Sequence, residues 1–130
     1  MEVLQPYLLV FVGAGFGGVL RHIMNLVVSR TLGTGFPWGT AIINVSGSTV
    51  MGLLIGWLAF KAGAEWTQHV RLFVATGVLG GYTTFSTFSL ESILLIERGN
   101  FGSAVAYIGG SVLLGVAGLW AGLSLARTLT

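Results

Sequence analysis

Apolar residues fall into four long runs along the chain, at about residues 7–29, 38–60, 71–95 and 101–126. A helix needs roughly 20 apolar residues to cross a hydrocarbon core about 30 Å thick. Each run is long enough for one crossing, and short polar or glycine-rich segments separate the runs. The pattern therefore predicts an all-α membrane protein of four transmembrane helices, with residues 1–130 forming a single transmembrane domain.

The composition supports this class of protein. Of 130 residues, 54% are hydrophobic and 8% are charged, and the mean hydropathy is +0.89. Soluble domains carry about 25% charged residues, so a surface this poor in charge is not suited to water. The absence of cysteine excludes disulfides and thiolate metal sites. The net charge of +2 is small and gives no reason to expect a nucleic-acid partner.

The basic residues between the runs are balanced across the membrane. One face would hold Lys61, Arg71 and Arg127. The other would hold Arg30 and Arg98, and Arg21 as well if its side chain snorkels outward. Because Lys and Arg in short loops set the orientation, this balance favours neither direction. Either a weak bias in these charges is enough to fix one orientation, or copies insert in both directions and pair as an antiparallel dual-topology homodimer.

Glycine pairs give a second reason to expect close helix packing. Several of the 21 glycines stand four residues apart in the predicted spans: Gly13/Gly17, Gly52/Gly56, Gly77/Gly81 and Gly118/Gly122. Such pairs let helix backbones approach closely in lipid, where no hydrophobic drive brings helices together. We expect part of them to pack helices within one subunit and part to serve a dimer, since closed two-fold dimers are the commonest assemblies.

Two polar side chains inside the spans need a reason, because an unsatisfied polar group in hydrocarbon is costly. Asn44 lies near the start of the second span. Its amide would either donate to an anion or join two helices, a contact worth about 1 kcal/mol. Arg21 lies deep in the first span, where a central charge costs about 2.5–3.5 kcal/mol. Its side chain would either snorkel outward, which the sequence favours, or supply a positive potential.

The third run is unusual because hydroxyls occupy positions 83, 84, 86, 87 and 89. Side chains at these spacings cannot share one face of a helix. Gly80 and Gly81 weaken the helix just before them. Irregular backbone at membrane depth is tolerated only where protein buries it or it lines a polar cavity. We therefore expect a break between about Gly80 and Thr83, unless the hydroxyls bond back to carbonyls of their own helix.

Aromatic side chains accompany this polar stretch. Phe85 and Phe88 are three residues apart and share a helical face. Such a pair usually serves packing, but the edge of an aromatic ring is positive. Ring edges together with hydroxyl and amide donors would line a path for a small anion. Tyr107 and Ser111 share a face of the fourth run and would either extend this path or bond across helices.

At these residues the chain resembles the Fluc (CrcB-type) fluoride channel family, and the resemblance covers all four runs. The motifs that carry it are Gly17-Gly18-Val19-Leu20-Arg21, the run from Trp38 to Gly47 with Asn44, the run from Gly80 to Glu91, and Tyr107 with Ser111. The third motif is long and chemically unusual, which makes the match specific. The resemblance implies a multi-pass protein of the cell (inner) membrane that assembles as an antiparallel homodimer with two fluoride pathways.

The resemblance also assigns residues. Pathway positions of the family match Asn44, Phe85, Phe88, Tyr107 and Ser111, and we add Thr84 and Arg21 to the candidate pathway. A structural sodium ion at the dimer centre would be held by the backbone carbonyls of Gly80 and Thr83 from both subunits. Gly115 stands where some relatives carry a further hydroxyl, and Glu91 matches a family acid whose role stays open.

These expectations lead to a function. Fluoride is small and strongly hydrated, so a selective path must replace its water with many fixed donors, none of which holds the ion too tightly. We expect a fluoride-selective channel that exports cytoplasmic fluoride by passive flux and so confers fluoride resistance. The alternatives are a small dual-topology transporter of organic cations, which needs an acid within the spans, and a non-transporting assembly subunit. An enzyme is not expected, because no nucleophile–base spacing occurs.

Overall fold

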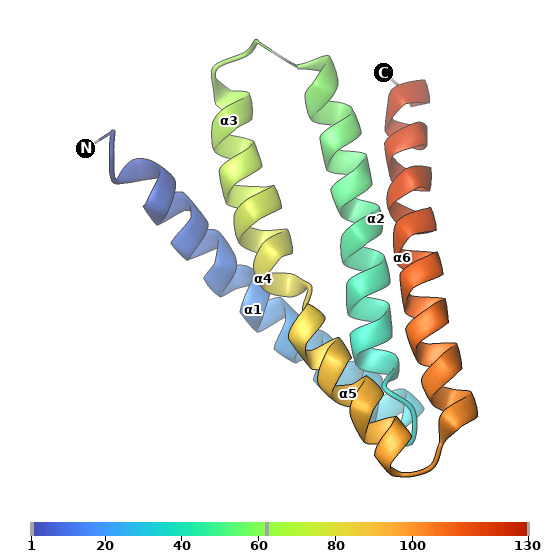
Figure 1. Ribbon diagram of the computed structural model, residues 1–130. Coiled ribbons are helices and arrows are strands. Elements are labelled where there is room, and N and C mark those ends of the chain that lie inside the picture. Colours follow the sequence, from blue (N-terminus) through green and yellow to red (C-terminus); the bar gives the residue numbers. More distant parts are fainter. Residues whose placement is uncertain (1, 62, 130) are drawn as a thin grey trace.

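The computed structural model describes residues 2–61 and 63–129, and within these ranges the regular structure is entirely helical (Figure 1). The elements in chain order are α1 (Gln5–Leu32), α2 (Trp38–Phe60), α3 (Trp66–Val70), the π-helix η1 (Arg71–Leu79), α4 (Gly80–Tyr82), α5 (Phe85–Glu97) and α6 (Phe101–Leu129). Among the described residues, three helices are long and apolar enough to cross a membrane, namely α1, α2 and α6. They correspond to the first, second and fourth apolar runs.

The third run folds as a series of shorter pieces. It begins at Trp66 and ends at Glu97, whereas the sequence predicted 71–95. Its middle, η1, is a π-helix in which the Gly80 N–H donates to the Ala75 carbonyl, five residues back. The π-helix is rare, appears mostly as single-turn bulges inside α-helices, and is frequent at functional sites. Hydrophobic periodicity gave no signal for this widened segment.

The helices are arranged as two side-by-side pairs. In Figure 1, α1 packs along η1 and α4, and α2 packs along α6. The members of each pair run in the same direction, and both chain termini lie at the same end of the molecule. The α5 helix continues beyond the break toward the opposite end, where short loops join α1 to α2 and α5 to α6.

Glycines determine how closely each pair packs. A Cβ at Gly77 would lie 2.9 Å from the Gly13 Cα, and one at Gly17 would lie 2.8 Å from the Tyr82 nitrogen. A Cβ at Gly81 would meet Ala14. The backbones of α1 and the third helix therefore touch, which is possible only because these positions lack a side chain.

The second helix pair uses the same device. A Cβ at Gly52 would meet the Leu119 carbonyl of α6, and one at Gly122 would meet the Thr49 carbonyl of α2. Gly56 and Gly118 face the partner helix in the same way. All four glycine pairs thus pack helices within one chain. The expectation that part of them serves a dimer stays a prediction, which these contacts within the subunit do not support.

The third helix is broken, as the hydroxyl pattern predicted, but the break lies at Thr83 and Thr84. Both residues are extended, with φ/ψ of −79°/158° and −151°/119°. Gly80 remains helical at −63°/−38°. The adjacent glycines therefore do not break the helix. Gly81 instead allows the close approach to α1 described above.

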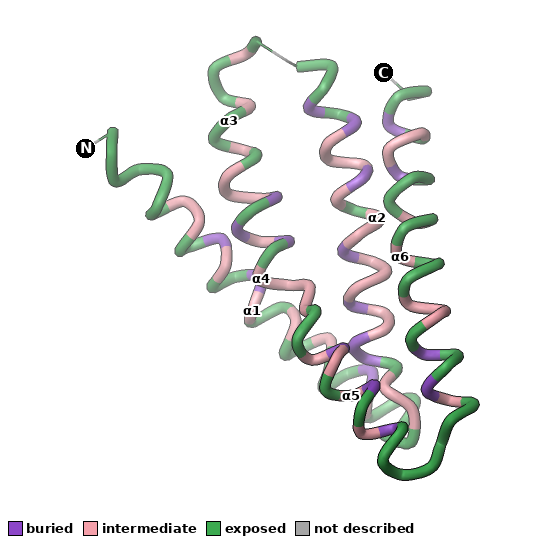
Figure 2. Tube along the Cα trace, viewed as in Figure 1, coloured by how far each residue is buried: buried purple, intermediate pink, exposed green. Residues whose placement is uncertain are grey.

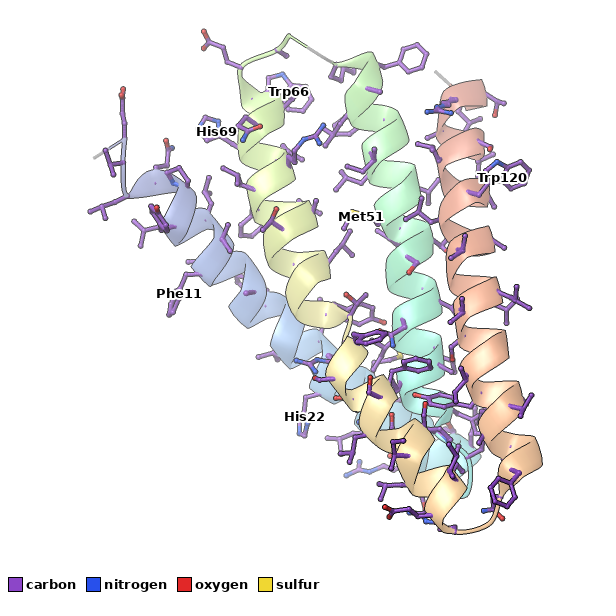
Figure 3. The ribbon with its side chains drawn as sticks, in the orientation of Figure 1. Phe11, His22, Met51, Trp66, His69 and Trp120 are labelled. Atoms are coloured by element: carbon purple, nitrogen blue, oxygen red, sulfur yellow. The ribbon has the colours of Figure 1, made fainter. Side chains whose placement is uncertain are left out.

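The outer surface is apolar along most of its length. Phe11, Val105 and Trp120 are each about 70% exposed or more, and Phe11 and Trp120 point away from the bundle in Figure 3. Figure 2 shows exposed residues along the whole of α6. Large apolar side chains facing outward at this density suit lipid. This is the surface of a multi-pass membrane protein.

Candidate functional site

The break in the third helix is held by Asn44. Its Nδ2 donates to the Thr84 carbonyl at 3.0 Å, and the Thr84 N–H donates to its Oδ1 at 2.8 Å. The amide thus pairs with the extended backbone as a neighbouring strand would. An amide group has two N–H donors, so the pair uses one and the second can donate to a ligand. Asn44 therefore joins two helices, and this role does not exclude anion binding.

Thr84 also begins the next helix. Its Oγ1 accepts from the Thr87 N–H at 3.2 Å and lies 3.1 Å from the Thr87 hydroxyl. A threonine in this position satisfies one of the free N–H groups at a helix start. Two other hydroxyls bond back to their own helix: Thr83 to the Leu79 carbonyl at 2.9 Å, and Ser89 to the Phe85 carbonyl at 3.0 Å. The helix break and the bonding of hydroxyls to carbonyls of their own helix, which were expected as alternatives, therefore occur together.

The break redirects two backbone donors. In an uninterrupted helix the N–H of residue 84 would donate to the Gly80 carbonyl, and that of residue 87 to the Thr83 carbonyl. Here the Thr84 N–H goes to the Asn44 side chain and the Thr87 N–H to the Thr84 hydroxyl. The carbonyls of Gly80 and Thr83 are thereby released for another partner. Carbonyl oxygens are suitable ligands for a hard cation.

A cavity of about 360 Å³ lies beside the break, between α2, α5 and α6. It brings together six of the residues that the sequence proposed for a site: Asn44, Thr83, Thr84, Phe85, Phe88 and Ser111. Ser48 and Met51 line it as well and were not predicted. They follow Asn44 by four and seven residues, so helical spacing from Asn44 would have identified them.

Three aromatic rings lead away from the break. Phe85 is 78% exposed at the edge of the cavity, whereas Phe88 is 9% exposed. Their ring centroids are 5.7 Å apart, and the Phe88 ring is 5.2 Å from that of Tyr107. Both separations lie within the range of favourable aromatic pairs. The rings therefore form a continuous series from the cavity to Tyr107.

Tyr107 does not line the cavity and is buried, with 1% of its surface exposed. Its hydroxyl donates to the Glu91 Oε1 at 3.1 Å. Glu91, whose role the sequence left open, therefore has a definite hydrogen-bond partner. The polar track expected from Tyr107 and Ser111 therefore divides, because Ser111 lies at the cavity while Tyr107 reaches toward α5.

Arg21 lies on another side of the break. Together with His22 and Asn25 of α1, it lines a separate cavity of about 250 Å³. Thr84 lines this cavity and the one that contains Asn44. The structure thus connects Arg21 to the remaining site through Thr84 and does not place it among the rings.

Comparison with known proteins identifies the family of the chain. The model of the family described as "CrcB-like protein, Camphor Resistance (CrcB)" matches residues 8–123. The chain is 60% identical to the "Fluoride-specific ion channel FluC" of Rhodopseudomonas palustris, over 97% of this chain and 100% of that protein. It is also 60% identical to "Fluoride-specific ion channel FluC 2" of Nitrobacter hamburgensis, over 95% and 98% of the two chains. The "Fluoride-specific ion channel FluC" of Beijerinckia indica is 60% identical over 98% of this chain and 100% of that protein.

Proposed function

This chain belongs to the CrcB-like family, and on that premise we propose that it is a fluoride-selective ion channel that exports fluoride from the cytoplasm by passive flux. The observation that carries the proposal is the cavity beside the helix break. The described residues that line it are all uncharged, and they supply an amide, hydroxyls and ring edges. Weak neutral donors of this kind can replace the water of a small anion without trapping the ion. The protein is not an enzyme.

Passive export explains why such a channel is useful. Fluoride enters a cell as neutral HF, which crosses membranes and dissociates inside. Fluoride then accumulates, and a selective path lets it leave down its gradient. The channel lies in the inner cell membrane, which is the barrier that HF has crossed, and it confers fluoride resistance.

The transport unit contains four spans in each subunit. The α1, α2 and α6 helices each make one crossing, and the series from α3 to α5 makes the remaining one around the break. A broken span at this depth requires that protein or a polar cavity cover it.

An antiparallel homodimer provides this cover. Ser86 and Phe85, next to the break, are exposed in a single subunit. A second copy packed on this face would shield the polar stretch from lipid and give two pathways in one assembly. The balanced basic residues of the loops support insertion in both directions. The glycine pairs give no support, because they pack helices within the subunit.

A structural sodium ion belongs at the centre of this dimer. The carbonyls of Gly80 and Thr83 would hold it. The N–H groups that would bond to these carbonyls in an unbroken helix donate to other acceptors, which supports this assignment. Two carbonyls from each subunit supply oxygen ligands without a charged side chain. A bound cation would join the subunits and make the potential near the break more favourable for anions.

Transport of organic cations is not favoured. A small cation transporter needs an acid in its substrate path. Glu91 is hydrogen-bonded by Tyr107 and is not among the residues that line the cavity beside the break. The geometry around that cavity therefore favours an anion.

Halide efflux from liposomes tests the function. The purified protein is reconstituted into liposomes at low density. Valinomycin is added to dissipate the membrane potential, and the release of fluoride and chloride is then followed with ion-selective electrodes. We expect rapid fluoride release and chloride release no faster than from protein-free liposomes. Equal release of both halides, or of neither, would show that the proposed function is wrong.

A further inference from the structure

A second polar cavity, of about 310 Å³, lies at the end of the bundle where residues 33–37 join α1 to α2. Its walls come from four parts of the chain. Asn25 and Ser29 belong to α1, Phe36 to the loop, Trp38 to the start of α2 and Glu91 to α5, and Arg98 directly follows α5. Neither the sequence motifs nor the proposed pathway includes this loop.

Aromatic rings connect this cavity to the break. The Tyr107 ring, which is 5.2 Å from Phe88, lies 5.6 Å from the Phe36 ring at an interplanar angle of 89°. Phe36 in turn lies 4.6 Å from Trp38. The series that starts at Phe85 therefore continues through Tyr107 into the loop. The contact between Phe36 and Tyr107 is edge-to-face, an arrangement in which the positive edge of one ring meets the face of the other.

A hydrogen bond connects the same two places. Tyr107 is buried and touches Phe88, which lines the first cavity. Its hydroxyl donates to Glu91, which lines the second cavity. Tyr107 thus stands between the two cavities.

We propose that the second cavity is one mouth of the fluoride pathway, which opens outward in one subunit of the antiparallel dimer and inward in the other, and that Phe36 is a positioning residue that places its ring beside Tyr107 at the deep end of this mouth. The inference rests on the proposed function and extends it from the break to the surface. Where the mouth opens outward, a fluoride ion that has passed Phe88 would move past Tyr107 and leave between the loop and α5. Arg98 in the cavity wall offsets the negative charge of Glu91 for an outgoing anion.

Cysteine modification tests the mouth, because the chain contains no cysteine of its own. Thr34 lines the second cavity, so a Thr34→Cys variant is labelled in detergent with a bulky anionic methanethiosulfonate and then reconstituted. Gln68→Cys is the matched control, since Gln68 is exposed at the other end of the molecule. We expect labelling to stop fluoride release from Thr34→Cys and to leave Gln68→Cys unchanged.

The outcomes separate the two proposals. If mass spectrometry shows complete labelling of Thr34→Cys and fluoride release is still normal, the mouth is misassigned while the channel function stands. If the unlabelled wild-type protein releases no fluoride, the proposed function fails and this inference falls with it.

A second set of variants tests Phe36 itself. Phe36→Leu keeps most of the volume but removes the ring, whereas Phe36→Tyr keeps the ring edge. Phe60→Leu is the control, because Phe60 is an exposed phenylalanine at the opposite end of α2. We expect fluoride release to slow about fivefold in Phe36→Leu, the effect of losing one favourable edge contact. Release should be nearly normal in Phe36→Tyr and Phe60→Leu. Equal slowing in Phe36→Leu and Phe36→Tyr would contradict a role for the ring edge.

Discussion

Asn44 and Thr84 are 40 residues apart in the chain and exchange two hydrogen bonds across the break in the third helix. This pair holds the two sides of the break together beside the proposed pathway. It keeps the Thr84 backbone extended, directs its N–H away from the Gly80 carbonyl, and places an amide at the wall of the cavity.

Replacing Asn44 by alanine should stop most of the fluoride flux. The change removes the amide from the cavity and leaves the Thr84 N–H and carbonyl without their partner, which costs about 1–3 kcal/mol for each half-buried group. We expect a lower thermal stability in detergent together with slow release from liposomes. Asn100→Ala is the control, since Asn100 is an exposed asparagine. Normal fluoride release by Asn44→Ala would exclude the amide from the pathway.

Phe85→Leu should separate transport from folding. Phe85 is 78% exposed within one subunit, so its ring contributes little to packing inside that subunit. We expect fluoride release to slow about tenfold or more, because a wall of weak donors loses one of its ring edges. Elution on size-exclusion chromatography should be unchanged. Phe11→Leu, at an equally exposed phenylalanine on the outer face of α1, should release fluoride normally. If both variants behave alike, the ring at position 85 has no special role.

Alanine at Gly17 should weaken the packing of α1 on the third helix. The new Cβ would lie 2.8 Å from the Tyr82 nitrogen and would press on the backbone of residue 78. Overpacking of this kind costs about 1–3 kcal/mol. Gly15→Ala is a matched control on the same helix, because nothing lies within 4 Å of a Cβ there. Thermal unfolding in detergent should show a lower midpoint for Gly17→Ala, and equal midpoints for the two variants would contradict the packing.

Withdrawal of sodium should destabilise the protein. An ion that binds only the folded dimer stabilises it by about 2.7 kcal/mol when its concentration is 100 times the dissociation constant. We therefore expect a lower unfolding midpoint in N-methyl-D-glucamine chloride than in sodium chloride at the same ionic strength. Asn44→Ala should show a smaller difference between the two salts, because the Gly80 carbonyl would no longer be kept free. An identical midpoint of the wild-type protein in both salts would remove the sodium site from the proposal.

The sequence by itself determined the class of protein and the part of the chain where a helix breaks. Long apolar runs and the scarcity of charge are properties of local composition, and a hydrocarbon solvent permits few structures for them. The hydroxyls from 83 to 89 could not share one helical face, so a break near them was predictable from spacing alone. The same local logic found Phe85 and Phe88, and it identified Asn44 as a polar group that needed a partner.

Only the tertiary structure decided which groups meet. The break lies at Thr83 and Thr84, after the glycines, because Asn44 supplies hydrogen bonds from another helix. Glu91 accepts a hydrogen bond from the Tyr107 hydroxyl, and Phe36, in the loop between α1 and α2, extends the series of aromatic rings. These contacts join segments far apart in the sequence. Their positions depend on how closely two helices approach, which side-chain spacing within one helix does not specify.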